Sequence, residues 1–200
     1  MTFLIAGLGN IGAQYENSRH NIGFRVADAW ASRHRATFTA DTLAFRAQFD
    51  FAGHQVHVIK PTTYMNESGR AVRHWQVQLK IPLSQLLVVV DDLALPFGTI
   101  RIRPKGSDGL HNGLTSVEQQ LGTSAYPRLR IGIGHEFAPG QQVNYVLGPW
   151  SPQQQQQLPQ VLELCCDALD SFIVVGLNKT MSRFNRKPQP PTTETPAVPD

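Results

Sequence analysis

The sequence of 200 residues is poor in cysteine and contains no long apolar run. Its two cysteines, Cys165 and Cys166, are adjacent, and adjacent cysteines rarely bridge each other or form a zinc site alone. This scarcity is typical of a reducing cytoplasm. No segment approaches the ~20 apolar residues of a membrane span, and Met1–Phe3 lacks the basic and apolar regions of a signal peptide. We therefore expect a cytoplasmic protein without membrane contact.

Charge is modest, since 16% of the residues are charged and 41% are hydrophobic, as is ordinary for a globular protein. The chain is long enough to bury one full core as a single domain. Its formal net charge is +3 and its pI is about 9.1. Such a mild excess of positive charge permits a polyanionic partner but does not demand one.

Common signatures of covalent and metal-dependent catalysis are also missing. The sequence has no G-x-S-x-G elbow, and its cysteines lie in an apolar helical pattern. It has no H-x-x-x-H or Cys/His ligand spacing, so no metal site is expected. Any hydrolysis would therefore use a base that acts directly on water.

A glycine pattern is present, because Gly7-Leu8-Gly9-Asn10-Ile11-Gly12 spells the dinucleotide fingerprint G-x-G-x-x-G. An apolar strand, Phe3–Ala6, precedes it, but no helix begins at the third glycine. Helical periodicity begins only near His20, and the acidic residue expected after a second strand is missing. The pattern favours a polar loop that brings Asn10 and His20 to the carboxyl end of the first strand, where α/β sheets bind ligands.

Apolar runs and helical patterns alternate along the rest of the chain, which predicts an α/β sheet covered by helices on both faces. The Gln-rich stretch is expected to form the start of the long helix, with Ser151 as its N-cap and Pro152 at its first position. Pro159 is expected to kink or restart this helix. The expected strands are Phe3–Ala6, a hairpin of Ala44–Phe51 and Gln55–Lys60, Leu86–Val90, Thr99–Arg103 and Arg128–Ile133, and the expected helices are His20–His34, Ser68–Leu79, Gly113–Leu121, Leu158–Val175 and Lys179–Phe184.

The last residues differ in composition from the body of the chain. Residues 187–200 contain five prolines among threonines and few apolar side chains, which predicts a disordered tail. We therefore expect one folded domain over residues 1–186.

Unusual polar residues gather in four loops, each of which follows a predicted strand. They are Asn10 and His20, then Pro61–Asn66, then Asp91–Pro96, and finally Lys105–Gly113. If these loops meet at one edge of the sheet, they bring together a histidine with a nearby carboxylate, a second histidine and three asparagines. A histidine oriented by an aspartate is a general base near neutral pH, and amides can stabilise an oxyanion. The set predicts hydrolysis.

Each of these residues also has a plainer interpretation. His20 can be a helix N-cap, and Asp91 can close a turn. Asn112 is expected to cap the helix that follows it, even if it also takes part in catalysis, and Asn66 can cap its helix in the same way. The remaining histidines show no clustering and are expected at the surface; they are His34, His54, His57, His74 and His135.

Basic residues alternate along two predicted strands. Arg101, Arg103 and Lys105 share one strand face, and so do Arg128 and Arg130. A solvated strand face explains this pattern from charge alone. Beside a proposed catalytic loop, a clamp for phosphate groups becomes a fair alternative.

Five blocks of sequence stand out over about residues 1–185. The first is Gly7–Gly12 with Tyr15, Arg19-His20-Asn21 and Gly23; the others are Pro61–Gly69, Asp91-Asp92-Leu93 with Leu95-Pro96 and Gly98, Gly106-Ser107 with Gly109 and His111–Leu114, and Arg128–Gly134. Together, and in family order, they resemble the bacterial-type peptidyl-tRNA hydrolase family. Several motifs in register are far more specific than one glycine pattern.

The resemblance implies a cytoplasmic enzyme that cleaves the ester between a nascent peptide and the 3′-terminal ribose of tRNA, without a cofactor. It implies a single α/β domain with a twisted, mixed and largely parallel sheet, acting as a monomer without an obligate protein partner on the acceptor stem and 3′ end of tRNA. The resemblance implies that His20 is the base and that Asp91 orients it. It implies that Asn10 and Asn66 hold the substrate, with Met65 lining the pocket, and that Asn112, beside His111, positions the water or the oxyanion. It further implies that Tyr15 lies at the acceptor-end cleft and that Arg103 or Lys105, with Arg130, clamps the tRNA 5′-phosphate.

Two positions depart from the usual family pattern. Ala94 stands where an aspartate is common, and Leu110 where a glycine is common. Neither change removes a proposed catalytic group. Leu110 adds a side chain beside His111 that is expected to narrow the cleft or stiffen its rim.

Two other functions compete with hydrolysis. A non-catalytic RNA-binding relative, acting as a splicing or assembly factor, would be favoured by a lost base or amide, and none is lost here. A dinucleotide-binding oxidoreductase is disfavoured by the missing helix and the missing ribose-binding acid.

Overall fold

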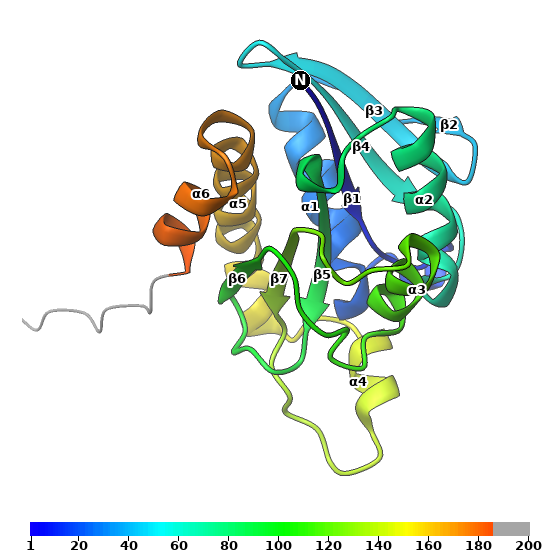
Figure 1. The fold of residues 1–200 in the computed structure, drawn as a ribbon. Helices are drawn as coiled ribbons and strands as arrows, with labels where there is room; N and C mark the ends of the chain where they lie inside the picture. Colours follow the sequence, from blue (N-terminus) through cyan, green and yellow to red (C-terminus); the bar gives the residue numbers. More distant parts are fainter. Residues whose placement is uncertain (186–200) are drawn as a thin grey trace, which may run out of the picture.

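A computed structural model describes residues 1–185 and shows one twisted sheet at the centre of the molecule (Figure 1). The strand order is β2-β3-β4-β1-β5-β7-β6. The central strands β4, β1, β5 and β7 run parallel, and the outer strands pair antiparallel. The bounds are β1 Thr2–Gly7, β2 Thr39–Asp41, β3 Ala44–Phe51, β4 His54–Pro61, β5 Leu86–Asp92, β6 Ile100–Arg103 and β7 Arg128–Gly132.

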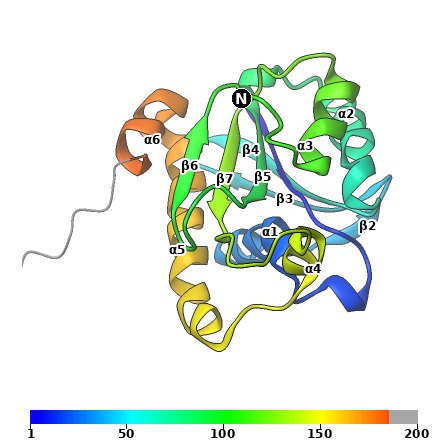
Figure 2. The same ribbon diagram turned by 90° about the horizontal axis from the view of Figure 1, so that it is seen from below.

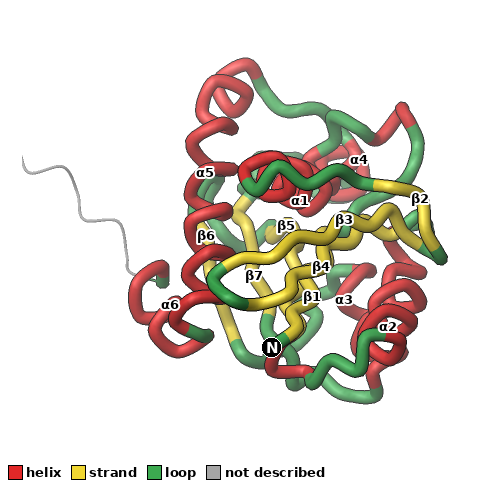
Figure 3. The backbone as a smooth tube through the Cα atoms, turned by 90° about the horizontal axis from the view of Figure 1, so that it is seen from above, coloured by secondary structure: helices red, strands yellow, loops and turns green. Residues whose placement is uncertain are grey.

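Helices cover both faces of the sheet, with α1 and α2 on opposite sides (Figure 3). The α1 and α5 side packs around Trp30 and Phe172, and the other side packs α2 and α3 around Trp75 and Leu114. The helices are α1 Ile22–Arg33, α2 Ser68–Gln78, α3 Asn112–Leu121, α4 Gln142–Leu147, α5 Pro152–Val175 and α6 Leu177–Phe184. The central strands are apolar on both faces because each face meets a helix layer.

The predicted fold class, the hairpin and the main helices are confirmed. Ser151 caps α5 in a capping box with Gln154, and Pro152 is the first helical residue, as predicted. A restart at Pro159 was wrong, because α5 continues through it as one helix. Pro159 is exposed, so water can reach the carbonyl group that the proline leaves without a donor. The sequence did not predict β2 or α4, and the tail expected at residues 187–200 lies outside the described residues.

One predicted strand end was assigned to the wrong edge of the sheet. Strand β6 is antiparallel to β7, and Arg103 pairs in register with Arg128, at the start of β7. The chain after β6 therefore begins at the amino edge of the parallel strands and returns along β7 to reach His111. The four polar loops do meet, but the fourth arrives by this detour.

The expectation that five histidines lie at the surface was wrong for His57 and His34. His57 is buried in β4, where burial and the neighbouring positive charge of Arg46 lower its pKa to about 4. His34 bonds Asp170 through Nε2 at 2.8 Å and stacks on Phe49. Burial in the strand explains the position of His57, and the tertiary contact with Asp170 explains that of His34. Neither can be seen from the spacing of histidines in the sequence.

Glycines let α1 approach the ends of β1 and β5 very closely. A Cβ atom on Gly23 would lie 2.5 Å from the carbonyl oxygen of Leu8 and 2.6 Å from that of Val89. A Cβ atom on Gly7 would lie 2.2 Å from the carbonyl oxygen of Gly23. Since real atoms cannot approach so closely, only glycine allows this packing, which fixes the start of α1 and the preceding His20 against the sheet.

Candidate active site

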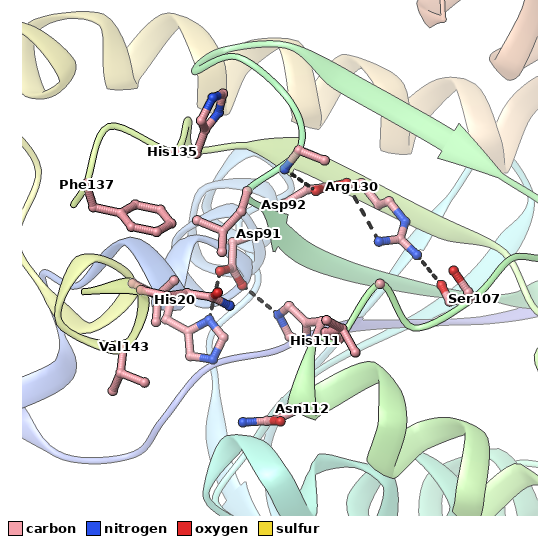
Figure 4. A pocket seen from close by; sticks show the side chains of 16 residues that line it. His20, Asp91, Asp92, Ser107, His111, Asn112, Arg130, His135, Phe137 and Val143 are labelled. Atoms are coloured by element: carbon pink, nitrogen blue, oxygen red, sulfur yellow. Dashed lines mark hydrogen bonds and ion pairs between the residues drawn. The ribbon is translucent and has the colours of Figure 1, made fainter. Parts of the chain in front are cut away.

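Asp91, near the end of β5, lies between two histidines from distant parts of the chain (Figure 4). His20 precedes α1, and its Nδ1 lies 2.8 Å from Asp91 Oδ2. His111 precedes α3, and its Nε2 lies 2.7 Å from Asp91 Oδ1. The side chain of Asp91 is only 2% exposed, so both contacts form in a medium from which water is largely excluded.

The hydrogen bonds of His111 fix its tautomer. Its Nδ1 accepts hydrogen bonds from the backbone N–H groups of Gly113 and Leu114, which makes His111 the N-cap of α3. An accepting Nδ1 carries no proton, so Nε2 carries it and donates to Asp91. The cap of α3 and the contact with Asp91 therefore occupy both ring nitrogens of His111. The prediction that Asn112 caps α3 was wrong, because Asn112 is already its first helical residue.

His20 has a different arrangement. Its Nδ1 donates to Asp91, and its Nε2 makes no hydrogen bond within residues 1–185. Burial would lower the pKa of His20, but the charge of Asp91 and the hydrogen bond outweigh it and raise that pKa above its ordinary value. Burial would likewise raise the pKa of Asp91, yet its attraction to the two histidines holds that pKa well below its usual range. The pair therefore presents an oriented imidazole with a free Nε2.

Asn10 is locked by hydrogen bonds beside this pair. Its backbone N–H donates to Asn21 Oδ1 at 2.8 Å, and its carbonyl accepts from Asn21 Nδ2 at 2.9 Å. Its own Oδ1 accepts from the backbone N–H of Met65 at 2.8 Å. The Nδ2 group of Asn10 is thus left available as a donor. Asn21 was not among the predicted site residues, although its position directly after His20 was the available signal.

A cavity of about 610 Å³ opens next to His20 and Asp91. Phe137 and Val143 lie on one side of Asp91 in Figure 4, and Arg130 and Ser107 lie on the other. The lining residues are His20, Asp91, Asp92, Leu93, Ala94, Ser107, Gly109, Leu110, His111, Asn112, Arg130, His135, Phe137, Gln142, Val143 and Val146. The segment after β7 supplies its apolar wall, which the sequence did not predict.

Arg19 connects this wall to His20. Its Nη1 donates to the carbonyl of Tyr145 at 3.0 Å, and its guanidinium carbon lies 4.0 Å from the centre of the Tyr145 ring. Its backbone N–H donates to the carbonyl of Gly148. The Tyr145 hydroxyl in turn donates to the carbonyl of Ile133, just after β7. Helix α4 therefore rests beside the start of α1 (Figure 2).

Other predicted site residues lie outside the cavity. Met65 is buried, whereas Asn66 is exposed in a 3-10 turn and does not cap α2, as the sequence had suggested. Tyr15 is half-buried in another 3-10 turn, Ala13–Tyr15. None of these three residues, nor Asn10, lines the cavity. The predicted set therefore divides into a cavity group and a group next to Asn10.

The basic residues do not act as one solvated face. Arg128 is fully buried, and its Nη1 donates to the carbonyls of Gly106 and Ser107 in the returning segment. Arg130 donates to the carbonyl of Ser107 and lies 3.6 Å from Asp92, at the cavity. Arg103 and Lys105 are exposed near the far end of β6. Register places Arg103 three residues from Ile131, the partner of Asp91, or roughly 10 Å along the strands.

His20, Asp91 and His111 also form a cluster in which one ligand atom from each could reach a common ion. Its hydrogen bonds argue against that use. The facing atoms of both histidines carry protons that they donate to Asp91, and His111 cannot move its proton to Nδ1 without confronting two backbone N–H donors. The donor set fits a hydrogen-bonded triad better than a metal centre.

Comparison with known proteins assigns the chain to one family. The family model described as peptidyl-tRNA hydrolase matches residues 4–192. The chain belongs to the peptidyl-tRNA hydrolase family. A peptidyl-tRNA hydrolase of Cytophaga hutchinsonii is 49% identical over 187 residues, which are 94% of this chain and 100% of the relative. That of Porphyromonas gingivalis is 45% identical over 185 residues, or 92% and 100% of the two chains.

Solved structures agree with this assignment to the peptidyl-tRNA hydrolases. The crystal structure of the enzyme from Acinetobacter baumannii has a TM-score of 0.85 and 31% sequence identity, over 92% of this chain and 94% of that one. No helix within residues 1–185 is both long enough and apolar enough to cross a membrane.

Proposed function

We propose that this chain hydrolyses the ester bond between a peptidyl group and the 3′-terminal ribose of tRNA, with water activated by His20. The observation that carries the proposal is the buried His20–Asp91 pair, whose free Nε2 lies at the edge of a cavity. Family membership supports peptidyl-tRNA as the substrate. It also disfavours the alternative of a non-catalytic RNA-binding factor.

The reaction follows from the roles of the two groups. His20 Nε2 takes a proton from water as the water oxygen attacks the ester carbonyl, and Asp91 stabilises the imidazolium that forms. The tetrahedral intermediate then expels the ribose oxygen, which receives the proton from His20. The products are a peptide carboxylate and tRNA with a free terminal hydroxyl. This cycle would return tRNA from stalled or aborted translation.

The remaining polar groups are proposed to hold the substrate. Asn10 Nδ2 and Asn66 would donate to the peptidyl half, with Met65 against its apolar parts. Asn112 at the cavity would position the water or the oxyanion. Tyr15 would contact the acceptor end of the tRNA. Arg130 with Arg103 or Lys105 would contact its 5′-phosphate.

We further propose that the chain acts in the cytoplasm as a monomer, on the acceptor stem and 3′ end of tRNA. Each catalytic group proposed above comes from one chain, so the chemistry requires no partner subunit.

The direct test is release of tRNA from N-acetyl-aminoacyl-tRNA by the purified chain and by His20→Ala. Loss of a general base should lower kcat about 10²- to 10⁴-fold, while binding of uncharged tRNA should change little. His54→Ala, at the first residue of β4, is the matched control and should keep full activity. Equal turnover by the His20 variant and the wild type would refute the mechanism.

A further inference from the structure

Leu110 has a backbone conformation that leucine rarely adopts. Its φ angle is +63°, in the left-handed region, and that of Gly109 before it is +59°. The backbone N–H of His111 donates to the carbonyl of Asp108, which closes a four-residue turn. Positive φ at both central residues is the pattern of a type I′ turn, in which glycine or asparagine is usual. The structure itself therefore indicates why glycine would be favoured at position 110.

Neighbouring hydrogen bonds impose this turn. Asp108 Oδ1 accepts from the backbone N–H of Leu110 at 3.0 Å, and Asp108 Oδ2 accepts from the Thr115 hydroxyl at 2.7 Å. The turn leads directly into His111, whose ring caps α3 and holds Asp91. Leu110 cannot relax its backbone without disturbing these contacts. The strain therefore persists in the folded protein.

The side chain gains nothing from burial that would offset this strain. Leu110 is 86% exposed, the largest exposure among the large apolar residues of the part that the structure describes. It nevertheless lines the cavity beside His20, together with Leu93, Phe137 and Val143. Val143 is itself 65% exposed. Two exposed apolar side chains thus lie at one catalytic cavity, where only a ligand could cover them.

We propose that Leu110 is a substrate-binding residue that contacts the terminal nucleoside of the tRNA. This inference rests on the proposed function and extends it. The peptidyl half is assigned to Asn10 and Met65, which do not line the cavity. The cavity offers an apolar wall with the aromatic ring of Phe137. The flat face of a base matches such a wall, because bases stack on aromatic rings.

The test replaces Leu110 with Gly and measures hydrolysis of two substrates that differ only in the acyl group, N-acetylglycyl-tRNA and N-acetylphenylalanyl-tRNA. Loss of the leucine contact should raise KM about tenfold for both, with kcat little changed. The melting temperature should stay the same or rise, because glycine tolerates positive φ. Leu110→Ala, which keeps the strain but removes the contact, should raise KM similarly.

Leu43→Gly is the matched control, because Leu43 has a φ angle of +60° in the β2–β3 turn and does not line the cavity. It should leave KM unchanged. A KM increase for the phenylalanyl substrate alone would assign Leu110 to the peptidyl half and overturn the proposal, as would an unchanged KM for both.

Binding of adenosine 5′-monophosphate, followed by titration calorimetry, tests the contact without turnover. Leu110→Gly should weaken this binding and Leu43→Gly should not. If the wild type hydrolysed neither ester, the proposed function would fail, while this titration would still support the nucleoside contact or refute it.

Discussion

At the scale of single residues, the two histidines on Asp91 differ because their second nitrogens differ. The second nitrogen of His111 is occupied by two backbone N–H donors at the start of α3. The second nitrogen of His20 is free at the cavity. One carboxylate therefore contacts a ring whose two nitrogens are both occupied and a ring whose second nitrogen is free. We expect His111 to act on catalysis only through the position of Asp91.

Asp91→Asn should lower the maximal kcat/KM about 10²- to 10⁴-fold and should move its acid limb to lower pH. Burial lowers the pKa of His20 and Asp91 raises it, so removing the carboxylate leaves only the lowering effect. The base would then stay deprotonated at more acidic pH. A pH profile of kcat/KM checks this shift.

Asp50→Asn, an exposed position at the end of β3, is the control for loss of one negative charge and should leave the profile in place. An acid limb that stays in place in the Asp91 variant would show that the limb does not arise from protonation of His20.

The His20–Asp91 pair also affects the stability of the fold. Because the pKa of His20 is raised in the folded protein, protonation of His20 stabilises the wild type below the ordinary histidine pKa. This contribution is lost as the pH rises through the folded pKa.

At the scale of elements, the sequence predicted what local patterns encode. The apolar run of β5 and the helical periodicity of α2 needed no tertiary information. The direction of β6 did require tertiary information, because antiparallel and parallel edge strands show the same alternation of apolar and polar residues. The buried arginine of β7 shows the same limit: Arg128 and Arg130 alternate like a solvated face, yet Arg128 is enclosed by the returning segment.

The site was predicted to a similar degree. The order of strands and loops predicted a histidine with a nearby carboxylate, and the family resemblance implied that these are His20 and Asp91. The cap of α3 could not be assigned to His111 rather than Asn112, because both residue types can accept from a helix N-terminus. Helix α4 was missed because its six residues are too few to show a periodic pattern.

Arg19→Lys should loosen α4 and lower kcat/KM about fivefold, since lysine has no planar fork to join two acceptors and no flat surface to stack on Tyr145. Hydrogen exchange should become faster in residues 134–148. The check combines exchange measured by mass spectrometry with steady-state kinetics.

Arg33→Lys is the control for this change. Arg33 also joins α1 to α5, through ion pairs with Asp167, Asp170 and Glu163, but does not contact α4. It should lower the melting temperature without faster exchange at residues 134–148. Equal exchange in the Arg19 variant and the wild type would show that α4 holds its place without the arginine.

At the scale of the whole molecule, the net charge of +3 is small for a partner as acidic as tRNA. Binding should therefore depend on a few placed cations rather than on a general field. Arg103 is exposed and lies away from the cavity, whereas Arg130 is partly occupied by Ser107 and Asp92. The two arginines should contribute differently to substrate binding.

Arg103→Gln should raise KM for full-length peptidyl-tRNA and reduce the salt slope of log KM by about 0.7 to 0.9 for the lost phosphate contact. Hydrolysis of N-acetyl-aminoacyl-adenosine, which lacks the 5′-phosphate of tRNA, should not change. Kinetics at several salt concentrations measure both effects. Arg35→Gln, an exposed arginine just after α1, should leave the slope as it is. Equal weakening of both substrates by the Arg103 change would refute the phosphate contact.

The close approach of α1 to the sheet gives the glycine fingerprint a different meaning. The volume that a pyrophosphate would need is occupied by protein: Gly7 faces the backbone of Gly23, and a Cβ atom on Gly9 would lie 2.8 Å from the ring of Phe24. In a nucleotide-binding protein the same spacing makes room for a cofactor, whereas here it makes room for a helix. The motif thus indicates how closely two backbones approach each other, and by itself it does not identify a cofactor site.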